Sequence, residues 1–226
     1  MKRIKRLTAF LLLFLSLPLN RASAAPIRKK KDESKKIALS FDDGPSRTNC
    51  ETILEILKKY NVRATFFIIG ECAAADEEKI ALIGQAGHEL GNHTYTHADI
   101  TRLSEEELEK EVKKTEEILT RISGTRPVVF RPPGGAYNEA SLRVLEKMGY
   151  QTVLWSVDTR DWTKPKVSTI VNTVEKNTAG GDIILFHDLA ETGSTTPEAL
   201  EIVIPFLLEE GYEFVTVSEL LNEKGS

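Results

Sequence analysis

The chain has 226 residues, of which 41% are hydrophobic and 28% are charged, and its net charge is −4. This composition is normal for a soluble globular protein, and the length suits one large domain or two small ones. Two cysteines, Cys50 and Cys72, are too few for a disulfide-rich scaffold.

The first 24 residues differ from the rest. A basic start, MKRIKR, precedes the apolar run LTAFLLLFLSLPL, and Ala22 and Ala24 stand at the small-residue positions before a cleavage point. This pattern predicts a secretory signal peptide over residues 1–24, and therefore a secreted or cell-envelope protein. The apolar run is too short for a comfortable bilayer span. An uncleaved N-terminal anchor is the alternative; after cleavage we expect no membrane span.

Cleavage would also change the charge balance. Residues 1–24 hold five of the 30 basic residues and none of the 34 acidic ones, so the remainder has 25 against 34, a net charge of −9. An acidic domain is a poor nucleic-acid binder. Residues 25–36 contain the basic cluster RKKK and predict a disordered polar linker. A solvated tether is the simpler interpretation, and contact with anionic lipid or wall polymer is the alternative.

From residue 37 to residue 222 the chain alternates between short apolar runs and segments with helical periodicity, which predicts one α/β domain with a parallel sheet. A capping box opens the longest helix, with Ser104 followed by Glu107. Seven or eight units in this length favour a single irregular (β/α)7-8 barrel. The expected strands are 37–41, 63–70, 88–92, 127–131, 151–157, 182–186 and 213–217. The expected helices are 50–61, 77–87, 104–124, 138–149, 167–178 and 197–211, with a final turn at 218–224.

Polar side chains follow several of these strands. Active sites of parallel barrels lie at the C-terminal ends of the strands, so these side chains are candidates for chemistry. Two adjacent carboxylates follow the first strand, a His-x-x-x-His pair follows the third, and a histidine ends the sixth. Two imidazoles and a carboxylate can bind a borderline divalent metal: zinc, with cobalt or iron possible, and three protein ligands leave a catalytic position open. We interpret the fourth histidine, His88, as structural.

This set, in this order, resembles the polysaccharide deacetylase family, also called the NodB-homology domain or carbohydrate esterase family 4. The family's five short motifs stand here as SFDDGP, HTYTH, RPPGG, DTRDW and LFH, and the resemblance spans about residues 36–221. It implies a metal-dependent N-deacetylase in which Asp43, His93 and His97 ligate the metal.

The resemblance also implies the roles of the catalytic residues. Asp42 is the general base that takes a proton from the attacking water, and Arg131 pairs with it. His187 protonates the leaving amine, which leaves poorly without that proton. Asp161 orients His187.

On the substrate side, the resemblance implies that the backbone N–H of Gly134 holds the oxyanion and that Trp162 and Leu185 wall the acetyl and sugar pocket. Many relatives carry a tyrosine where Gly134 stands, which makes the substrate preference less certain and predicts a more open groove. Leu185 also fits a plain core position.

These implications predict a monomeric enzyme that acts on N-acetylglucosamine units of a carbohydrate polymer, peptidoglycan first. Chitin oligosaccharides, an exopolysaccharide and acetylated xylan are the other polymers. A small-amide hydrolase and a non-catalytic carbohydrate-binding protein are the other classes.

The two cysteines can be paired or free. Cys50 opens the first helix and Cys72 follows the second strand, at one face of the barrel, so a disulfide between them is one of these two alternatives.

Overall fold

The protein is described from a computed structural model, covering residues 25–30, 34–188 and 194–222. The expected signal peptide lies outside these residues. Among the residues described, no helix combines the length and the apolar character needed to cross a membrane.

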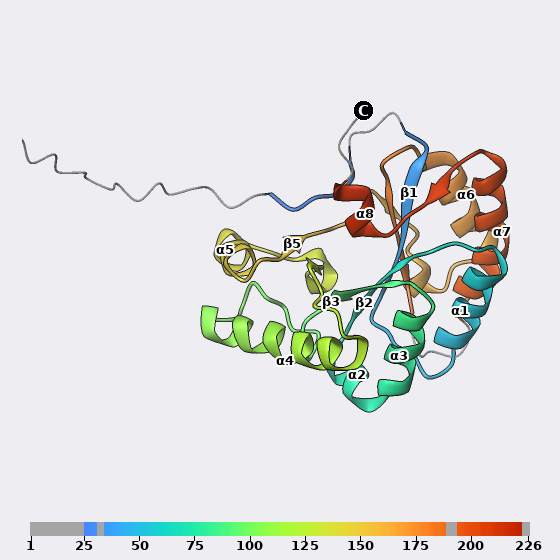
Figure 1. Ribbon diagram of the computed structural model, residues 1–226. Coiled ribbons are helices and arrows are strands. Elements are labelled where there is room, and N and C mark those ends of the chain that lie inside the picture. The colour runs from blue at the N-terminus through green and yellow to red at the C-terminus, as the bar shows by residue number, and fades with distance from the viewer. Residues whose placement is uncertain (1–24, 31–33, 189–193, 223–226) are drawn as a thin grey trace, which may run out of the picture.

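One parallel sheet runs through the domain in the order β5-β4-β3-β2-β1-β7-β6, and β8 pairs with β1 beside it. The helices form an outer layer around the curled sheet, with α4 and α5 near its β5 end and α6 and α7 near its β6 end (Figure 1). The strands are β1 Lys36–Asp42, β2 Thr65–Ile68, β3 Glu89–Asn92, β4 Val129–Phe130, β5 Gln151–Thr152, β6 Val157–Asp158, β7 Ile183–His187 and β8 Glu213–Phe214. The helices are α1 Cys50–Lys59, α2 Gly70–Ala75, α3 Glu77–Gln85, α4 Glu105–Ser123, α5 Glu139–Lys147, α6 Val167–Asn177, α7 Thr196–Glu209 and α8 Val217–Asn222, with two short 3-10 helices, η1 Pro133–Gly135 and η2 Asp161–Thr163.

The predicted fold class, an irregular α/β barrel of parallel strands, is confirmed. The capping box of α4 is also confirmed, and this helix ends at Gly124 in the left-handed conformation that favours glycine. Three details of the prediction are wrong. The short helix α2 was not expected, the final turn is the helix α8, and the expected strand 151–157 is two strands.

The divided strand explains why the barrel is irregular. β5 pairs with β4 and β6 pairs with β7, so the two halves of this apolar segment lie at opposite ends of the sheet path. Residues 153–156 cross between them. The sequence concealed this because an uninterrupted β-branched and aromatic run is the usual signature of one strand.

Alternation along β1 divides the core from the site. Ile37, Leu39 and Phe41 belong to the large apolar cluster that packs under the helices. Successive strand residues point to opposite faces, so Ser40 and Asp42 point the other way, into the barrel. β1 lies between β2 and β7, so its last inward side chain lies at the barrel mouth beside the ends of these two strands.

The segment before β1 is part of the fold. Ile27 donates a backbone hydrogen bond to Thr152 O (2.9 Å) and accepts one from Leu154 N (2.7 Å). Lys29 Nζ lies 2.9 Å from the carboxylate of Asp182, which is 2% exposed. The prediction of a disordered linker is therefore wrong for residues 25–30, which bridge from the end of β5 to the start of β7. Polar composition concealed this, because backbone hydrogen bonds require no particular side chain.

Lys29→Ala is expected to lower the free energy of unfolding by about 1 kcal/mol, because Asp182 would keep only neutral hydrogen-bond partners. Arg28→Ala removes the neighbouring exposed basic side chain and should change stability by less than about 0.5 kcal/mol. Urea unfolding of both variants measures the difference. Equal stabilities would mean that the segment is a tether in solution.

Candidate active site

The two adjacent aspartates point in different directions. Asp42 ends β1 on its inner face and is 4% exposed. Asp43 follows with φ +73°, a left-handed conformation that few non-glycine residues adopt. The strand alternation ends there, and Asp43 faces two histidines while Asp42 faces an arginine. Two neighbouring carboxylates are thus separated, each beside cationic or ligand groups.

Asp43, His93 and His97 form a candidate metal site, since their ligand atoms lie within 4.8 Å of one another. Asp43 Oδ1 is 3.4 Å from His93 Nε2 and 3.2 Å from His97 Nε2. His93 Nδ1 lies 2.6 Å from Arg131 O, which fixes its proton there and leaves the Nε2 lone pair for a metal.

The electrostatics of this cluster also suit a cation. Asp43 Oδ1 is buried, and no donor other than the histidine rings faces it. Burial acts to raise the pKa of Asp43, but the neighbouring His93 and His97 rings outweigh it and hold this pKa well below its usual range. A carboxylate and two imidazoles are a donor set that divalent zinc, cobalt or iron accepts. The residues present therefore fit the implied metal.

Arg131 fixes the orientation of Asp42. Its Nη1 donates to Asp42 Oδ1 (2.7 Å) and to Ser40 Oγ (2.8 Å), and its Nη2 donates to Leu154 O (3.0 Å). The guanidinium also lies over the Phe67 ring, 4.0 Å from the centroid. Arg131 is fully buried, so the pair is a shielded ion pair in which each charge requires the other.

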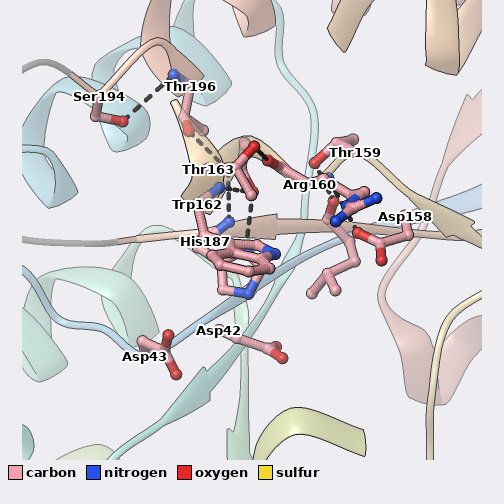
Figure 2. A network of polar contacts seen from close by, with 12 residues as sticks. Asp42, Asp43, Asp158, Thr159, Arg160, Trp162, Thr163, His187, Ser194 and Thr196 are labelled. Carbon is pink, nitrogen blue, oxygen red and sulfur yellow. Dashed lines mark hydrogen bonds and ion pairs between the residues drawn. The ribbon is translucent and has the colours of Figure 1, made fainter. Parts of the chain in front are cut away.

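His187 and Asp161 form a second pair, which comes from the end of β7 and from η2. Asp161 Oδ1 is 2.7 Å from His187 Nδ1, and its Oδ2 accepts from His187 N (2.8 Å) and Thr196 Oγ1 (2.7 Å). The ring of His187 is directed toward Asp42 and Asp43 (Figure 2). Burial acts to lower the pKa of His187, but Asp161 and the other two carboxylates outweigh it and raise this pKa. The imidazolium of His187 therefore holds its proton more firmly than a free histidine does, which suits a general acid.

The three residues expected on the substrate side lie around these pairs. Gly134 lies in η1 with φ +60°, and a Cβ built there would meet no atom within 4 Å, so the surface is open at this point. Trp162 is 51% exposed in η2. Leu185 is 2% exposed, two residues before His187 and on the same face of β7. The structure gives their positions, and their roles stay predictions.

Some residues of the site were missed. Ser40 could have been found, because strand alternation places it on the same face as Asp42. Thr196, 35 residues from Asp161, and the carbonyl of Leu154 have no local sequence signature. His88 is structural as interpreted: it accepts from Ala64 N (3.2 Å), and burial lowers its pKa to about 4.

The cysteines do not form a disulfide: Cys50 is buried and free, and Cys72 is free and half-buried. That alternative of the prediction is wrong here. Burial and the neighbouring Asp188 carboxylate raise the pKa of Cys50, so its thiol stays protonated and is a poor metal ligand.

A base, an acid and a cation position thus surround one space at the mouth of a parallel barrel. These groups together suit the hydrolysis of an amide or an ester. The fold and the site therefore define the class as a hydrolase.

Comparison with known proteins gives the family. A family model described as polysaccharide deacetylase matches residues 29–153. A peptidoglycan-N-acetylglucosamine deacetylase of Bacillus cereus is 42% identical over 195 residues, covering 85% of this chain and 91% of that protein. The peptidoglycan-N-acetylmuramic acid deacetylase PdaC of Bacillus subtilis is 38% identical over 208 residues, covering 92% of this chain and 43% of that protein. The chain belongs to the polysaccharide deacetylase family.

Solved structures of relatives have the same fold as this chain. The crystal structure of the Bc1960 peptidoglycan N-acetylglucosamine deacetylase superposes with a TM-score of 0.83 at 36% identity, covering 88% of this chain and 94% of that one. BA3943, a CE4 family pseudoenzyme from Bacillus anthracis, has a TM-score of 0.83 at 32% identity, covering 89% of this chain and 70% of that one. The fold is therefore shared by a relative named as a deacetylase and by one named as a pseudoenzyme, so the fold alone does not show activity.

The geometry predicts a division of labour between the aspartates. Alanine at Asp43, His93 or His97 is expected to remove both bound metal and activity. Asp42→Asn is expected to reduce activity by at least about 100-fold while metal stays bound, because Asp42 Oδ2 is 4.0 Å from His93 Nε2 and Asp42 is directed at Arg131. Elemental analysis of the dialysed proteins, with activity, measures both. An Asp42→Asn protein without metal would reverse the assignment.

The His187–Asp161 pair predicts a pH dependence. His187 must be protonated to act as the acid, and its protonated fraction falls as the pH rises through its pKa. In the wild type, Asp161 raises this pKa. Asp161→Asn removes that charge, so the pKa of His187 should fall and the alkaline limb of kcat should move to lower pH. Asp158→Asn, a neighbouring exposed carboxylate that accepts from Arg160 N, is the control. If the alkaline limb of the pH profile of kcat stays in place in Asp161→Asn, His187 is not the acid.

Proposed function

We propose that this protein removes the acetyl group from N-acetylglucosamine units of peptidoglycan. The observation that carries the proposal is that the Asp42–Arg131 pair, the His187–Asp161 pair and the candidate metal triad all meet at one barrel mouth. The names of the Bacillus cereus relatives support the choice of polymer and sugar.

The residues suggest the following order of proton transfers. Asp42, held by Arg131, accepts a proton from water as the water oxygen adds to the acetamide carbon. The backbone N–H of Gly134 hydrogen-bonds the carbonyl oxygen as it becomes negative. His187, whose Nδ1 is bonded to Asp161, donates its Nε2 proton to the amide nitrogen. The C–N bond then breaks and yields acetate and a free amino sugar.

Asp43, His93 and His97 would hold the metal in this scheme, and we propose zinc, with cobalt or iron as alternatives. When bound, the metal supplies Lewis acidity toward the carbonyl oxygen and the attacking water. The chain's own contribution is to hold the three ligand side chains together at the barrel mouth that Asp42 and His187 also face.

Other functions are less well supported. The relative PdaC is named for N-acetylmuramic acid, so this sugar is the second candidate position. Chitin oligosaccharides, an exopolysaccharide or acetylated xylan would place a slimmer chain than peptidoglycan in the same groove, which we expect to be open at Gly134. A non-catalytic role suits a chain that has lost a catalytic group, but here Asp42, His187 and the metal triad are all present. A small-amide substrate does not agree with the family's action on polymers.

We also propose that the protein is exported and acts as a monomer in the bacterial cell envelope. The basic, apolar and small-residue pattern of residues 1–24 supports export. Intact-mass analysis of protein from the host envelope should give an N-terminus near Ala25. A mass that retains Met1 would instead indicate a membrane anchor.

The substrate proposal predicts acetate release from purified peptidoglycan. After treatment and digestion, mass spectrometry should show N-acetylglucosamine units lighter by one acetyl group. Chitin oligomers, an acetylated exopolysaccharide and acetylated xylan serve as parallel substrates, and Asp42→Asn serves as the inactive control. Loss of acetyl groups from the muramic sugars alone, or from chitin alone, would show that the polymer or the sugar has been assigned wrongly.

A further inference from the structure

Two of the three candidate metal ligands have the left-handed backbone conformation, which is uncommon for residues other than glycine. Asp43 has φ +73° and His97 has φ +57°. A left-handed conformation is less stable than the usual backbone regions for a residue with a Cβ, so it persists where the surrounding structure holds it. Other contacts must therefore hold these two turns, and the same contacts fix where the ligand atoms lie.

The turn after Asp43 is held by Asp188, which is 1% exposed. Its carboxylate accepts from Ser46 N (3.1 Å) and from Ser46 Oγ (2.5 Å). Ser46 Oγ in turn accepts from Cys50 N (3.1 Å) at the start of α1. A Cβ on Gly44 would lie 2.6 Å from Asp188 Oδ2, so this close approach requires the glycine.

Asp188 also ties this turn to the catalytic acid. It follows His187 directly, and its backbone N–H donates to Asp42 O (2.8 Å). One residue therefore joins the end of β7, which carries His187, to the turn that carries Asp43. Its carboxylate takes part in none of the proton transfers described above.

The turn before His97 is held in the same way by Glu111 of α4. A single oxygen, Oε2, accepts from Tyr95 N (2.9 Å), Thr96 N (2.8 Å) and Thr96 Oγ1 (3.1 Å). The third ligand, His93, has its own anchor in Arg131 O. Each of the three ligands thus depends on a different polar group outside the ligand set.

We propose that Asp188 and Glu111 are positioning residues for the metal, which fix the turns of Asp43 and His97 and so set metal affinity without contacting metal or substrate. The inference depends on the metal site of the proposed function. Removing either carboxylate leaves backbone N–H groups without their partner and lets the turn relax. Groups that orient metal ligands typically change metal affinity by about 10- to 100-fold.

The test is titration of the full-length, metal-free protein with Co²⁺, followed by its visible absorption, and with Zn²⁺ in competition with a chelator. Asp188→Ala and Glu111→Ala should each weaken binding by about 10-fold or more and change the Co²⁺ spectrum. Glu111→Gln keeps an oxygen acceptor for the turn and should bind nearly as the wild type does. If Asp188→Ala does not fold, Ser46→Ala removes the hydroxyl that joins Asp188 to Cys50 N and should also weaken binding. Ser46→Thr keeps a hydroxyl at this position and should restore the affinity.

Glu89 provides a matched control. Its carboxylate accepts from Thr65 Oγ1 (2.8 Å), Ser218 N (3.1 Å) and Ser218 Oγ, but it begins β3, at the opposite end of the barrel. Glu89→Ala should lower the melting temperature and leave Co²⁺ affinity and spectrum unchanged. If the wild type binds Co²⁺ and both turn variants bind it as tightly as Glu89→Ala does, the inference fails. If the wild type itself takes up no Co²⁺ or Zn²⁺, the proposed metal site fails.

Discussion

The buried contact between Arg131 and Asp42 is the interaction on which the rest of the site depends. An arginine with no exposed surface is tolerable only when its charge is compensated, and Asp42 compensates it at 2.7 Å. The same arginine reaches the metal triad through its backbone, because its carbonyl oxygen faces His93 Nδ1. Breaking the side-chain pair would cost about 3–5 kcal/mol, so the base and the core around it are stabilised together.

This contact also explains the irregular part of the barrel. Arg131 needs a further acceptor inside the barrel, and Leu154 O provides it at 3.0 Å. Leu154 belongs to residues 153–156, which cross from one end of the sheet path to the other instead of pairing in a strand. The backbone N–H of Leu154 is then free to bind Ile27 O, and the N-terminal segment joins the fold there. The position of Arg131 is thus linked, through Leu154, to residues 25–30.

The His187–Asp161 pair is fixed in a similar way by other residues. His187 ends β7 as Asp42 ends β1, and these two strands are neighbours in register. The carboxylate of Asp161 contacts the Nδ1 atom and the backbone N–H of His187 and the hydroxyl of Thr196. Both of its oxygens therefore have a partner, and the His187 ring is held through Nδ1. Asp188 then connects the two strand ends. The expected base, acid and metal ligands are therefore fixed by polar contacts that join different elements of the fold.

The sequence by itself determined the fold class, and its motifs predicted ten site residues, of which the structure brings the Asp42–Arg131 pair, the His187–Asp161 pair and the candidate metal triad to one mouth. The period of apolar residues distinguishes helix from strand, and the ends of parallel strands meet at one mouth, so motifs such as SFDDGP and LFH could be placed together. Only the tertiary structure decided that residues 151–157 divide, that residues 25–30 dock, and that Glu111, Asp188 and Thr196 support the site. Those contacts join residues far apart in the chain, and a carboxylate or a carbonyl in such a contact looks locally like any exposed one.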